Sequence, residues 1–313
     1  MKPLEILVTS FLLFSFLGNA QKDITSLQRN SDAAQNIFNV GRGAYNHPSL
    51  YVNPFIGTGG HGHTYPGATV PFGMIQISPD TRFDGWDGCS GYHYSDSIIY
   101  GFSHTHLSGT GVPDYGDVLI CPQSGKAKTQ PGYLFKGGYG SNFSHKKETA
   151  SVGYYEVYLE EDQINVKLCA SERSGIHQYT FEKKEGEKHI LIDLDHRDML
   201  LSSALNLIDK NTISGYRVSS AWAKEQHLYF YLKLDTPYKK SKIISKNGQH
   251  KLLLTFPEET KSLTLKIGIS AVNEKGAANN LNTEIPGWNI NELRSESVKK
   301  WNTELNKIQI EDE

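Results

Sequence analysis

Short segments in which apolar and polar residues alternate follow one another from about Gly153 onward. In each segment the apolar side chains recur at every second position, which is the period of a β-strand with one buried face. The clearest examples are INVKLC at 164–169, HILIDL at 189–194, LYFYLKL at 228–234 and LTLKIGI at 263–269. Because no helical pattern separates these segments, the sequence predicts an antiparallel β-sandwich.

A tight hairpin is predicted inside this region. Asn247 and Gly248 stand between the apolar segments KIIS at 242–245 and KLLLTF at 251–256. This dipeptide is the strongest short hairpin signal, because both residues accept the positive φ angles of a two-residue turn. We therefore expect the two segments to pair as neighbouring antiparallel strands.

The pattern changes to a helical one near the C-terminus, from about Asn291. Asn291 is the predicted N-cap, and Glu292 lies in the first turn, where a carboxylate is favourable. An apolar stripe follows at steps of three to five residues: Leu293, Val298, Trp301, Leu305 and Ile308. Such a stripe must pack on something. We interpret it as a linker helix that lies on the sandwich or leads into a second domain; a terminal helix that caps the sheet is the alternative.

The N-terminus carries the pattern of a signal peptide. Lys2 precedes an apolar run from Ile6 to Leu17, and small residues follow at Gly18 and Ala20. The pattern predicts cleavage after residue 20 and export to the periplasm or the medium. The alternative is an uncleaved anchor, but a stretch this short barely spans a bilayer, so no stable membrane anchor is expected. Residues 21–49 are polar and are predicted to form a leader arm.

Composition narrows the function. The 313 residues carry a formal net charge of −2, so there is no basic surface of the kind that binds nucleic acid. The three cysteines cannot form a disulfide framework. Stability must therefore come from a hydrophobic core, which a chain of this length can supply.

One segment, Tyr51 to Asp117, differs from the rest of the chain. It holds 13 of the 29 glycines and five of the 12 histidines, but no lysine, no glutamate and a single arginine, Arg82. A solvated loop normally uses lysine and glutamate freely. We therefore expect this segment to be ordered and to be covered by another part of the protein.

The glycines of this segment do not form a nucleotide site. GTGGHG at 57–62 matches the pattern GxGxxG. A dinucleotide site needs a strand before this motif and a helix after it, and Pro66 and Gly67 break any helix here. The motif is therefore interpreted as a loop.

Two histidine pairs have the spacing H-x-H: His61 with His63, and His104 with His106. On an extended chain both members of a pair share a face, so each pair could bind a metal. The spacing fits no specific zinc signature, which favours structural histidines that are hydrogen-bonded within a glycine-rich loop layer.

The stretch DGWDGCSGYHYSD at 84–96 suggests a carbohydrate site. Trp86 offers a flat apolar face, and Asp87 and His93 offer hydrogen-bonding groups among glycines that allow close approach of the backbone. The alternative is an aromatic-rich corner of the core. The spacing of Cys89 and His93 also admits a thiol nucleophile, but without a third, orienting group a packed thiol is favoured.

The chain resembles a known family in the stretches VNPFIGTGGHGHTYPGATVPFGMIQISPDT, GWDGCSGYHYSDSIIYGFSHTHLSGTG and DYGDVLICP. They are similar to the N-terminal domain of glycoside hydrolase family 92, whose members are secreted, calcium-dependent exo-α-mannosidases. The resemblance is dense from about Tyr51 to Pro122 and looser up to about Trp301. It implies an N-terminal β-sandwich of the galactose-mutarotase-like supersandwich type, joined by helices to an (α/α)6 catalytic domain.

The resemblance also implies a mechanism and a division of roles. Hydrolysis is inverting: an acid protonates the leaving oxygen, a base activates water, and calcium positions the sugar and the water. The acid, the base and the calcium ligands belong to the helical domain, so no catalytic residue or metal ligand is carried over to this sequence. Phe55 to Gly59 is expected to face that helical domain. The expected sugar-binding residues are Trp86 as a stacking wall, Asp87, Cys89 and His93 around it, and then Arg82, His61 and His63.

The expected organisation follows from these interpretations. Residues 50–278 form the sandwich domain, and residues 279–313 form the linker helix toward the helical catalytic domain. The expected partners are that domain and a mannoside or N-glycan, and the chain alone is expected to be inactive. The alternatives are a stand-alone mannoside-binding module and a non-catalytic partner of a separately encoded catalytic subunit.

Overall fold

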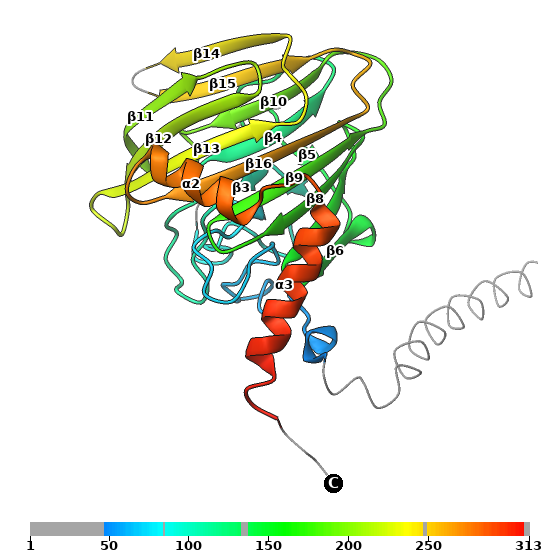
Figure 1. Cartoon of the computed structure of the whole chain (residues 1–313), viewed down its shortest axis with the longest axis vertical. Helices are drawn as coiled ribbons and strands as arrows, with labels where there is room; N and C mark the ends of the chain where they lie inside the picture. Colours follow the sequence, from blue (N-terminus) through cyan, green and yellow to red (C-terminus); the bar gives the residue numbers. More distant parts are fainter. Residues whose placement is uncertain (1–46, 84, 133–136, 247–248, 310–313) are drawn as a thin grey trace, which may run out of the picture. The chain divides into compact units, whose positions relative to one another are not determined.

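Two antiparallel sheets, one of six strands and one of eight, face each other and form a β-sandwich (Figure 1). The computed structural model describes residues 47–83, 85–132, 137–246 and 249–309, and residues from Ser49 onward form one packed unit. The predicted fold class, a mainly antiparallel β-sandwich, is confirmed. The predicted signal peptide and almost all of the predicted leader arm lie outside the described residues.

The six-stranded sheet has the order β1-β3-β4-β10-β15-β14. Its strands are β1 (Ser78–Asp80), β3 (Gly101–Ser103), β4 (Leu119–Ser124), β10 (Lys188–Asp193), β15 (Gln249–Phe256) and β14 (Lys240–Lys246). The last two pair in the register Lys246 to Gln249, as the hairpin prediction requires. Asn247 and Gly248 themselves lie outside the described residues.

The eight-stranded sheet has the order β11-β12-β13-β16-β9-β8-β7-β6. Its strands are β11 (Met199–Leu207), β12 (Thr212–Ser220), β13 (Gln226–Leu234), β16 (Ser262–Ser270), β9 (Ser174–Phe181), β8 (Ile164–Ala170), β7 (Tyr154–Leu159) and β6 (Glu148–Ser151). The remaining elements are a small sheet of β2 (Ile98–Ile99) and β5 (Ser141–Asn142), the 3-10 turns η2 (Pro48–Tyr51) and η3 (His145–Lys147), and the helices α2 (Glu274–Glu284) and α3 (Ile290–Leu305).

The main core lies between the two sheets. Ile190 and Leu252 of the six-stranded sheet belong to the same buried cluster as Val166, Phe230 and Leu265 of the eight-stranded sheet. Except for Leu252, these are positions that the period-two pattern predicted to point inward. Each fully buried side chain of this kind stabilises the fold by about 1.5–3 kcal/mol relative to exposure.

The central strands are buried on both faces, which the alternating pattern did not predict. Leu191, which points away from the main core, is fully buried with Leu119 and Tyr139 in a second cluster on the outer face of the six-stranded sheet. A third cluster lies on the outer face of the eight-stranded sheet and includes Ile176 and Leu281. Helices and loops therefore cover both outer faces in part.

Helix α2 lies across β13 and β16 and was missed by the sequence analysis (Figure 1). Asn273 is its N-cap, with a side chain that accepts a hydrogen bond from the Gly276 backbone N–H. Gly268 of β16 allows the close contact, because a Cβ there would lie 2.4 Å from the carbonyl oxygen of Ala277. The predicted domain boundary after residue 278 falls inside this helix.

Helix α3 begins at Ile290, with Asn289 as its N-cap instead of the predicted Asn291. It contacts β8 and β9 through Leu293 and Ser297, and the Ser297 hydroxyl donates to the carbonyl of Ala170 at 2.7 Å. Farther along, the Trp301 indole N–H donates to the carbonyl of Thr69 at 2.8 Å. The helix therefore joins the sheet to the glycine-rich loops. Ile308, the last member of the predicted stripe, lies beyond the helix and is exposed.

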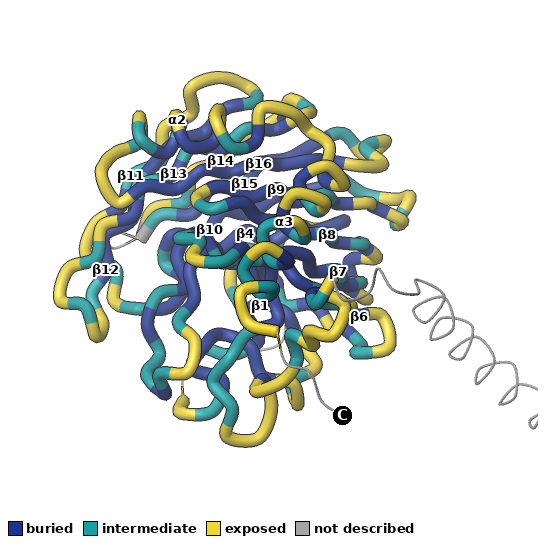
Figure 2. Tube along the Cα trace, turned by 60° about the horizontal axis from the view of Figure 1, so that its bottom comes forward, coloured by how far each residue is buried: buried dark blue, intermediate teal, exposed yellow. Residues whose placement is uncertain are grey.

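Residues 51–117, which we call the loop layer, form irregular loops at one end of the sandwich (blue to cyan in Figure 1). Only the short strands β1, β2 and β3 interrupt them. Figure 2 shows buried strands at the centre of the molecule and exposed turns among the loops around β1. Within the described part of the chain, neither helix is long and apolar enough to cross a membrane.

Candidate functional site

Residues 81–97, which we call the Trp86 loop, connect β1 to β2 and carry five of the seven predicted site residues. The loop folds back on itself, because the Thr81 N–H donates to the carbonyl of Gly91 at 2.7 Å. Gly88 has φ +73°, and a Cβ there would lie 2.9 Å from Cδ of Arg82. Only glycine combines this backbone conformation with so close an approach.

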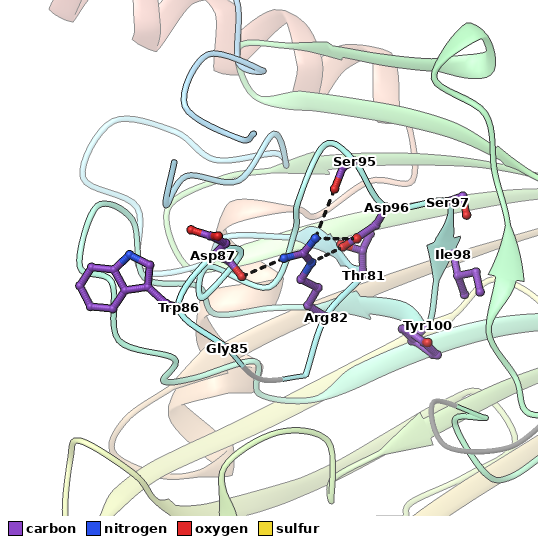
Figure 3. A pocket seen from close by; sticks show the side chains of 10 residues that line it. All are labelled: Thr81, Arg82, Gly85, Trp86, Asp87, Ser95, Asp96, Ser97, Ile98 and Tyr100. Atoms are coloured by element: carbon purple, nitrogen blue, oxygen red, sulfur yellow. Dashed lines mark hydrogen bonds and ion pairs between the residues drawn. The ribbon is translucent and has the colours of Figure 1, made fainter. Parts of the chain in front are cut away.

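Arg82 joins the beginning and the end of the Trp86 loop (Figure 3). Its Nε donates to Asp96 Oδ2 at 2.8 Å and its Nη2 to Oδ1 at 3.0 Å, which is a bidentate ion pair. Nη1 donates to the carbonyl of Asp87 at 3.3 Å, and Nη2 to the Ser95 hydroxyl at 3.2 Å. The guanidinium thus fixes the loop conformation around the predicted site.

His93 links the Trp86 loop to the GTGGHG segment. Its Nε2 lies 3.0 Å from the carbonyl of Gly60, and its Nδ1 lies 3.2 Å from both the Ser95 N–H and Arg82 Nη2. A carbonyl only accepts, and a guanidinium only donates. Nε2 therefore donates and Nδ1 accepts, and the side chain is buried.

Trp86 is an exposed aromatic residue of the site, with 64% of its surface accessible. One edge of the indole meets the ring of His63 at 5.0 Å between centroids and an interplanar angle of 84°. Nε2 of His63 is buried and has no hydrogen-bond partner among the described residues. Figure 3 shows the indole extending away from Arg82 and Asp96, so a flat apolar face is presented to solvent.

Asp87 and His61 form an exposed pair beside Trp86. His61 Nδ1 lies 2.9 Å from Asp87 Oδ1, and the two side chains are 89% and 34% exposed. The hydrogen bond from His61 lowers the pKa of the Asp87 carboxyl. Asp87 is therefore a carboxylate at neutral pH, ready to accept hydrogen bonds from a ligand.

Cys89 lies under the loop and is only 1% exposed. Its carbonyl accepts a hydrogen bond from Arg197 Nη2 at 2.8 Å. Both ring nitrogens of His93 are engaged by other groups, which agrees with a packed thiol rather than a Cys–His nucleophile. Contact of Cys89 with a sugar stays a prediction, and the burial of its side chain gives the thiol no direct access to solvent.

An open cavity of about 660 Å³ lies along this loop. Figure 3 shows Arg82 and Asp96 at its centre and Trp86 at one side. Its lining consists of Thr81, Arg82, Gly85, Trp86, Asp87, Ser95, Asp96, Ser97, Ile98 and Tyr100. The mixture of one aromatic face, hydroxyls and charged groups suits a small polar ligand with an apolar side.

His104 belongs to a buried chain of hydrogen bonds that fixes its protonation. Its Nδ1 donates to the carbonyl of Val118 at 2.7 Å, its Nε2 lies 3.0 Å from His177 Nε2, and the Tyr179 hydroxyl lies 2.8 Å from His177 Nδ1. Burial lowers the pKa of His104 to about 4 and that of His177 well below its usual value. Every group in this chain has a partner, as expected for a structural histidine.

The side chains of this face that the structure describes are not arranged as a calcium site. Calcium binds six to eight oxygen ligands, several of them carboxylates. Here Asp87 is paired with His61, and Asp96 with Arg82. Among the described residues, no group of three or more His, Cys, Asp or Glu side chains is arranged to hold a metal ion.

The sequence analysis missed one pair of carboxyls at the edge of the loop layer. The Tyr115 N–H donates to Asp198 Oδ2 at 2.7 Å, and the Ala223 N–H donates to Asp114 Oδ2 at 3.3 Å. Burial, with a hydrogen bond to Asp114, raises the pKa of Asp198 to about 7. Asp114 and Asp198 are 84 residues apart, so no sequence spacing could have revealed the pair.

The fold and the candidate site together describe a β-sandwich protein whose loop layer presents polar groups and an exposed aromatic ring at one end. The Glycosyl hydrolase family 92 N-terminal domain matches residues 51–270, and the chain therefore belongs to this family. This confirms the resemblance noted in the sequence.

Solved structures and a curated protein agree with this assignment. The chain is 35% identical to the family GH92 α-mannosidase BT3965 of Bacteroides thetaiotaomicron, with a TM-score of 0.78. The match covers 85% of this chain and 39% of the mannosidase. A family GH92 inverting mannosidase of the same organism, BT2199, gives 25% identity and a TM-score of 0.73, covering 84% and 37%. An uncharacterized secreted glycosidase of Arthroderma benhamiae is 26% identical over 83% of this chain and 38% of its own length.

The chain thus spans well under half the length of the relatives it matches. The shared part is the N-terminal domain of the family.

Proposed function

We propose that this chain supplies the sugar-binding face of an exported enzyme that removes terminal α-linked mannose from N-glycans or related mannosides. Three findings support the proposal: the family, a relative that is an α-mannosidase and was also solved with mannoimidazole, and a relative named as secreted. The reaction we propose is inverting, calcium-assisted hydrolysis, with the catalytic carboxylates and the calcium ligands outside this chain.

The exposed Trp86 ring beside an ionised carboxylate is the observation that carries the proposal. A sugar needs an apolar surface for the C–H face of its ring and polar groups for its hydroxyls. We assign the first role to Trp86 and the second to Asp87 and His61. Arg82 and His93 hold these groups in place, and His63 orients the indole from its edge.

The described carboxylates of the candidate site are both held in pairs, which suits binding rather than proton transfer. Inverting hydrolysis needs a general acid and a general base about 6.5–9.5 Å apart, on opposite faces of the sugar. In the described part of the site, the carboxylates are Asp87, held by His61, and Asp96, held by Arg82 in a bidentate pair. This chain therefore binds and orients the sugar, and a second domain supplies the proton transfers.

The loop layer has the surface expected of a covered face. Its exposed apolar side chains include Phe72 (92% exposed), Ile56 (74%) and Tyr51 (71%). Exposed apolar groups gathered in one region mark interaction sites. Helix α3 descends beside the loop layer, and its C-terminal end lies at the same end of the molecule (Figure 1). We propose that the helical catalytic domain covers this face, with the sugar between the two domains.

The same surface also suits a non-catalytic partner of a separately encoded catalytic subunit. A stand-alone mannoside-binding module is the other alternative, although half of a cleft buries little of a ligand. The complete reading frame separates these possibilities, because a helical domain encoded after residue 313 is required by the first and by neither of the others.

The proposal is tested with the polypeptide of the complete reading frame, assayed on α-1,2-mannobiose in the presence of calcium. We expect turnover by that polypeptide and none by residues 21–313 alone. Trp86→Ala should lower kcat/KM about 10- to 100-fold, which corresponds to about 1.4–2.8 kcal/mol of transition-state binding.

Trp288→Ala is the matched control. Trp288 is also partly exposed, but it lies over Lys266, at 4.5 Å from Nζ to the ring centroid, away from the loop layer. Equal losses in the two variants, or robust turnover by residues 21–313, would contradict the proposal.

A further inference from the structure

A group of buried ionisable side chains lies directly beneath the Trp86 loop. It consists of Asp80 at the end of β1, His106 in the loop layer, and His196 and Arg197 in the connection from β10 to β11. All four side chains are at most 2% exposed. None of them lines the cavity of the candidate site.

Asp80 is the only acid of this group, and three basic groups surround it. His106 Nε2 lies 3.3 Å from Oδ1, His196 Nε2 lies 3.2 Å from Oδ2, and Arg197 Nη1 lies 3.9 Å from Oδ1. Burial alone would raise the pKa of Asp80, but His196 and His106 outweigh it and hold the pKa well below its usual range. Asp80 is therefore a carboxylate that balances the buried Arg197 charge.

This arrangement is costly for the fold. Half of the buried side-chain polar atoms that lack a hydrogen bond, among the described residues, belong to Asp80, His196 and Arg197. Burying an ion pair carries a large desolvation cost, and an apolar replacement of similar volume is often as stable or more stable. Stability is thus a poor reason for a charged group here.

Arg197 and Asp80 contact the underside of the Trp86 loop. Arg197 Nη2 donates to the carbonyl of Cys89 at 2.8 Å, which fixes the main chain three residues after Trp86. At Gly91, a Cβ would lie 2.3 Å from Asp80 Oδ1 and 3.0 Å from Arg197 Nη1. The loop therefore rests on Asp80 and Arg197 with no space between.

The connection that carries Arg197 is itself held firmly. Arg217 of β12 is fully buried and donates to the carbonyls of Leu194, His196 and Arg197 at 2.9, 2.9 and 2.6 Å, and it pairs with Asp117. Arg197 and Asp198 both have positive φ, +51° and +43°. Non-glycine residues keep this conformation only where their surroundings impose it, and such strain gathers at functional sites.

We propose that Arg197 and Asp80 are positioning residues for the sugar-facing loop. Arg197 holds the Cys89 carbonyl, Asp80 neutralises Arg197 and leaves no room beneath Gly91, and Arg217 anchors the support to the eight-stranded sheet. Trp86 and Asp87 are thereby placed before a sugar arrives, which lowers the entropic cost of binding it. That this placement serves sugar binding rests on the proposed function. That Arg197 and Asp80 hold the loop is tested without a sugar.

The three buried cysteines provide the test. Cys89 lies in the supported loop, whereas Cys121 lies in β4 and Cys169 in β8. Labelling of the folded chain with N-ethylmaleimide, followed by peptide mapping, measures the three rates separately. In Arg197→Met we expect Cys89 to react about tenfold faster or more, because local opening of the loop becomes easier. The rates of Cys121 and Cys169 should stay as in the wild type.

Lys188→Met is the matched control for loss of a buried cation. Lys188 stands at the other end of β10 and donates to the carbonyls of Lys183 and Gly186 at 2.7 and 2.9 Å. This variant should leave the Cys89 rate unchanged. Arg197→Lys keeps the charge and one donor, so its Cys89 rate should fall between those of the wild type and Arg197→Met; it also serves if Arg197→Met does not fold.

A second readout follows the indole itself. In chain labelled with 5-fluorotryptophan, the Trp86 resonance, assigned with Trp86→Phe, should shift or broaden in Arg197→Met, while that of Trp288 stays fixed. An unchanged Cys89 rate, or rates that rise together at all three cysteines, would overturn the proposal. Because no sugar is present, this result is independent of the mannobiose assay that tests the proposed function.

Discussion

The sandwich strands and the loop layer are ordered by different interactions. Between the sheets, side chains such as Ile190, Phe230 and Leu265 are fully buried, and main-chain groups pair along regular ladders. In the loop layer, buried side chains include Asp80 and His104, and main-chain groups such as the Cys89 carbonyl bond to side chains. Ile77 and Phe102 of the loop layer also belong to the main core, but irregular main chain such as the Trp86 loop is held by polar side chains.

Both regions expose apolar side chains, which in the sandwich include Met199 and Leu201 of the edge strand β11 and Trp222 in the turn after β12. The loop layer leaves Phe72, Ile56 and Trp86 accessible, although it has a well-packed interior. A region with buried charges and exposed aromatic rings is organised to present a surface rather than to maximise its own stability. We therefore expect substitutions in the sandwich to lower stability according to the side-chain volume that they remove. In the loop layer, we expect the loss of a hydrogen-bond or ion-pair partner to decide the effect.

Arg217→Met should give the largest loss of stability, because this side chain joins the two regions. Its removal leaves Asp117 without its buried partner and three carbonyls without their donor. We expect the free energy of unfolding to fall by about 3–5 kcal/mol in urea denaturation. A loss below about 1 kcal/mol would show that the loop layer does not depend on this anchor.

Asp198→Asn tests the carboxyl pair at the edge of the loop layer through pH. The pKa of Asp198 is raised from 3.8 to about 7, so the folded state holds the proton more tightly. The resulting stability is full below pH 3.8 and is lost as the pH rises through 7. Asn mimics the protonated form, so the Tm of the variant relative to the wild type should rise by a few degrees between pH 5 and pH 8.

Asp235→Asn is the control for this pH series. Asp235 is exposed in the turn after β13. Its Tm difference from the wild type should not change with pH across the same range. If the Tm difference of Asp198→Asn does not change either, the raised pKa of Asp198 is refuted.

Ile190→Val tests the apolar side of the comparison. Ile190 is fully buried between the sheets, and the substitution removes one methylene without disturbing a polar partner. We expect a loss of about 0.5–1.5 kcal/mol in urea denaturation. The N-ethylmaleimide rate of Cys89 should change only as far as the rates of Cys121 and Cys169 do.

Trp86→Ala should have the smallest effect on stability. The side chain is 64% exposed, and its ring meets that of His63 in a T-shaped arrangement. We expect a change within about 0.5 kcal/mol in the free energy of unfolding. A loss of several kcal/mol would place Trp86 among the structural residues and would weaken its assignment as a binding surface.

The sequence predicted a compact set of site residues, which the structure brings together, but not the residues beneath them. Trp86, Asp87, Arg82 and His93 lie within one short stretch, so composition and the family resemblance suggested them together, and the structure brings His61 and His63 beside them. Arg197 was not predicted. It contacts Cys89 across 108 residues of sequence, a separation at which spacing carries no information.

By itself, the sequence determined the strand period, the hairpin pairing and the unusual glycine-rich segment, because each depends on residues that are close along the chain. The tertiary structure alone decided which strands are covered on both faces, where α2 lies, and that Asp80, Arg197 and Arg217 meet beneath the Trp86 loop. The alternation of apolar residues along a strand predicts only which face of that strand is buried. The partners of a buried charge come from distant segments, and only the folded chain brings them within 4 Å.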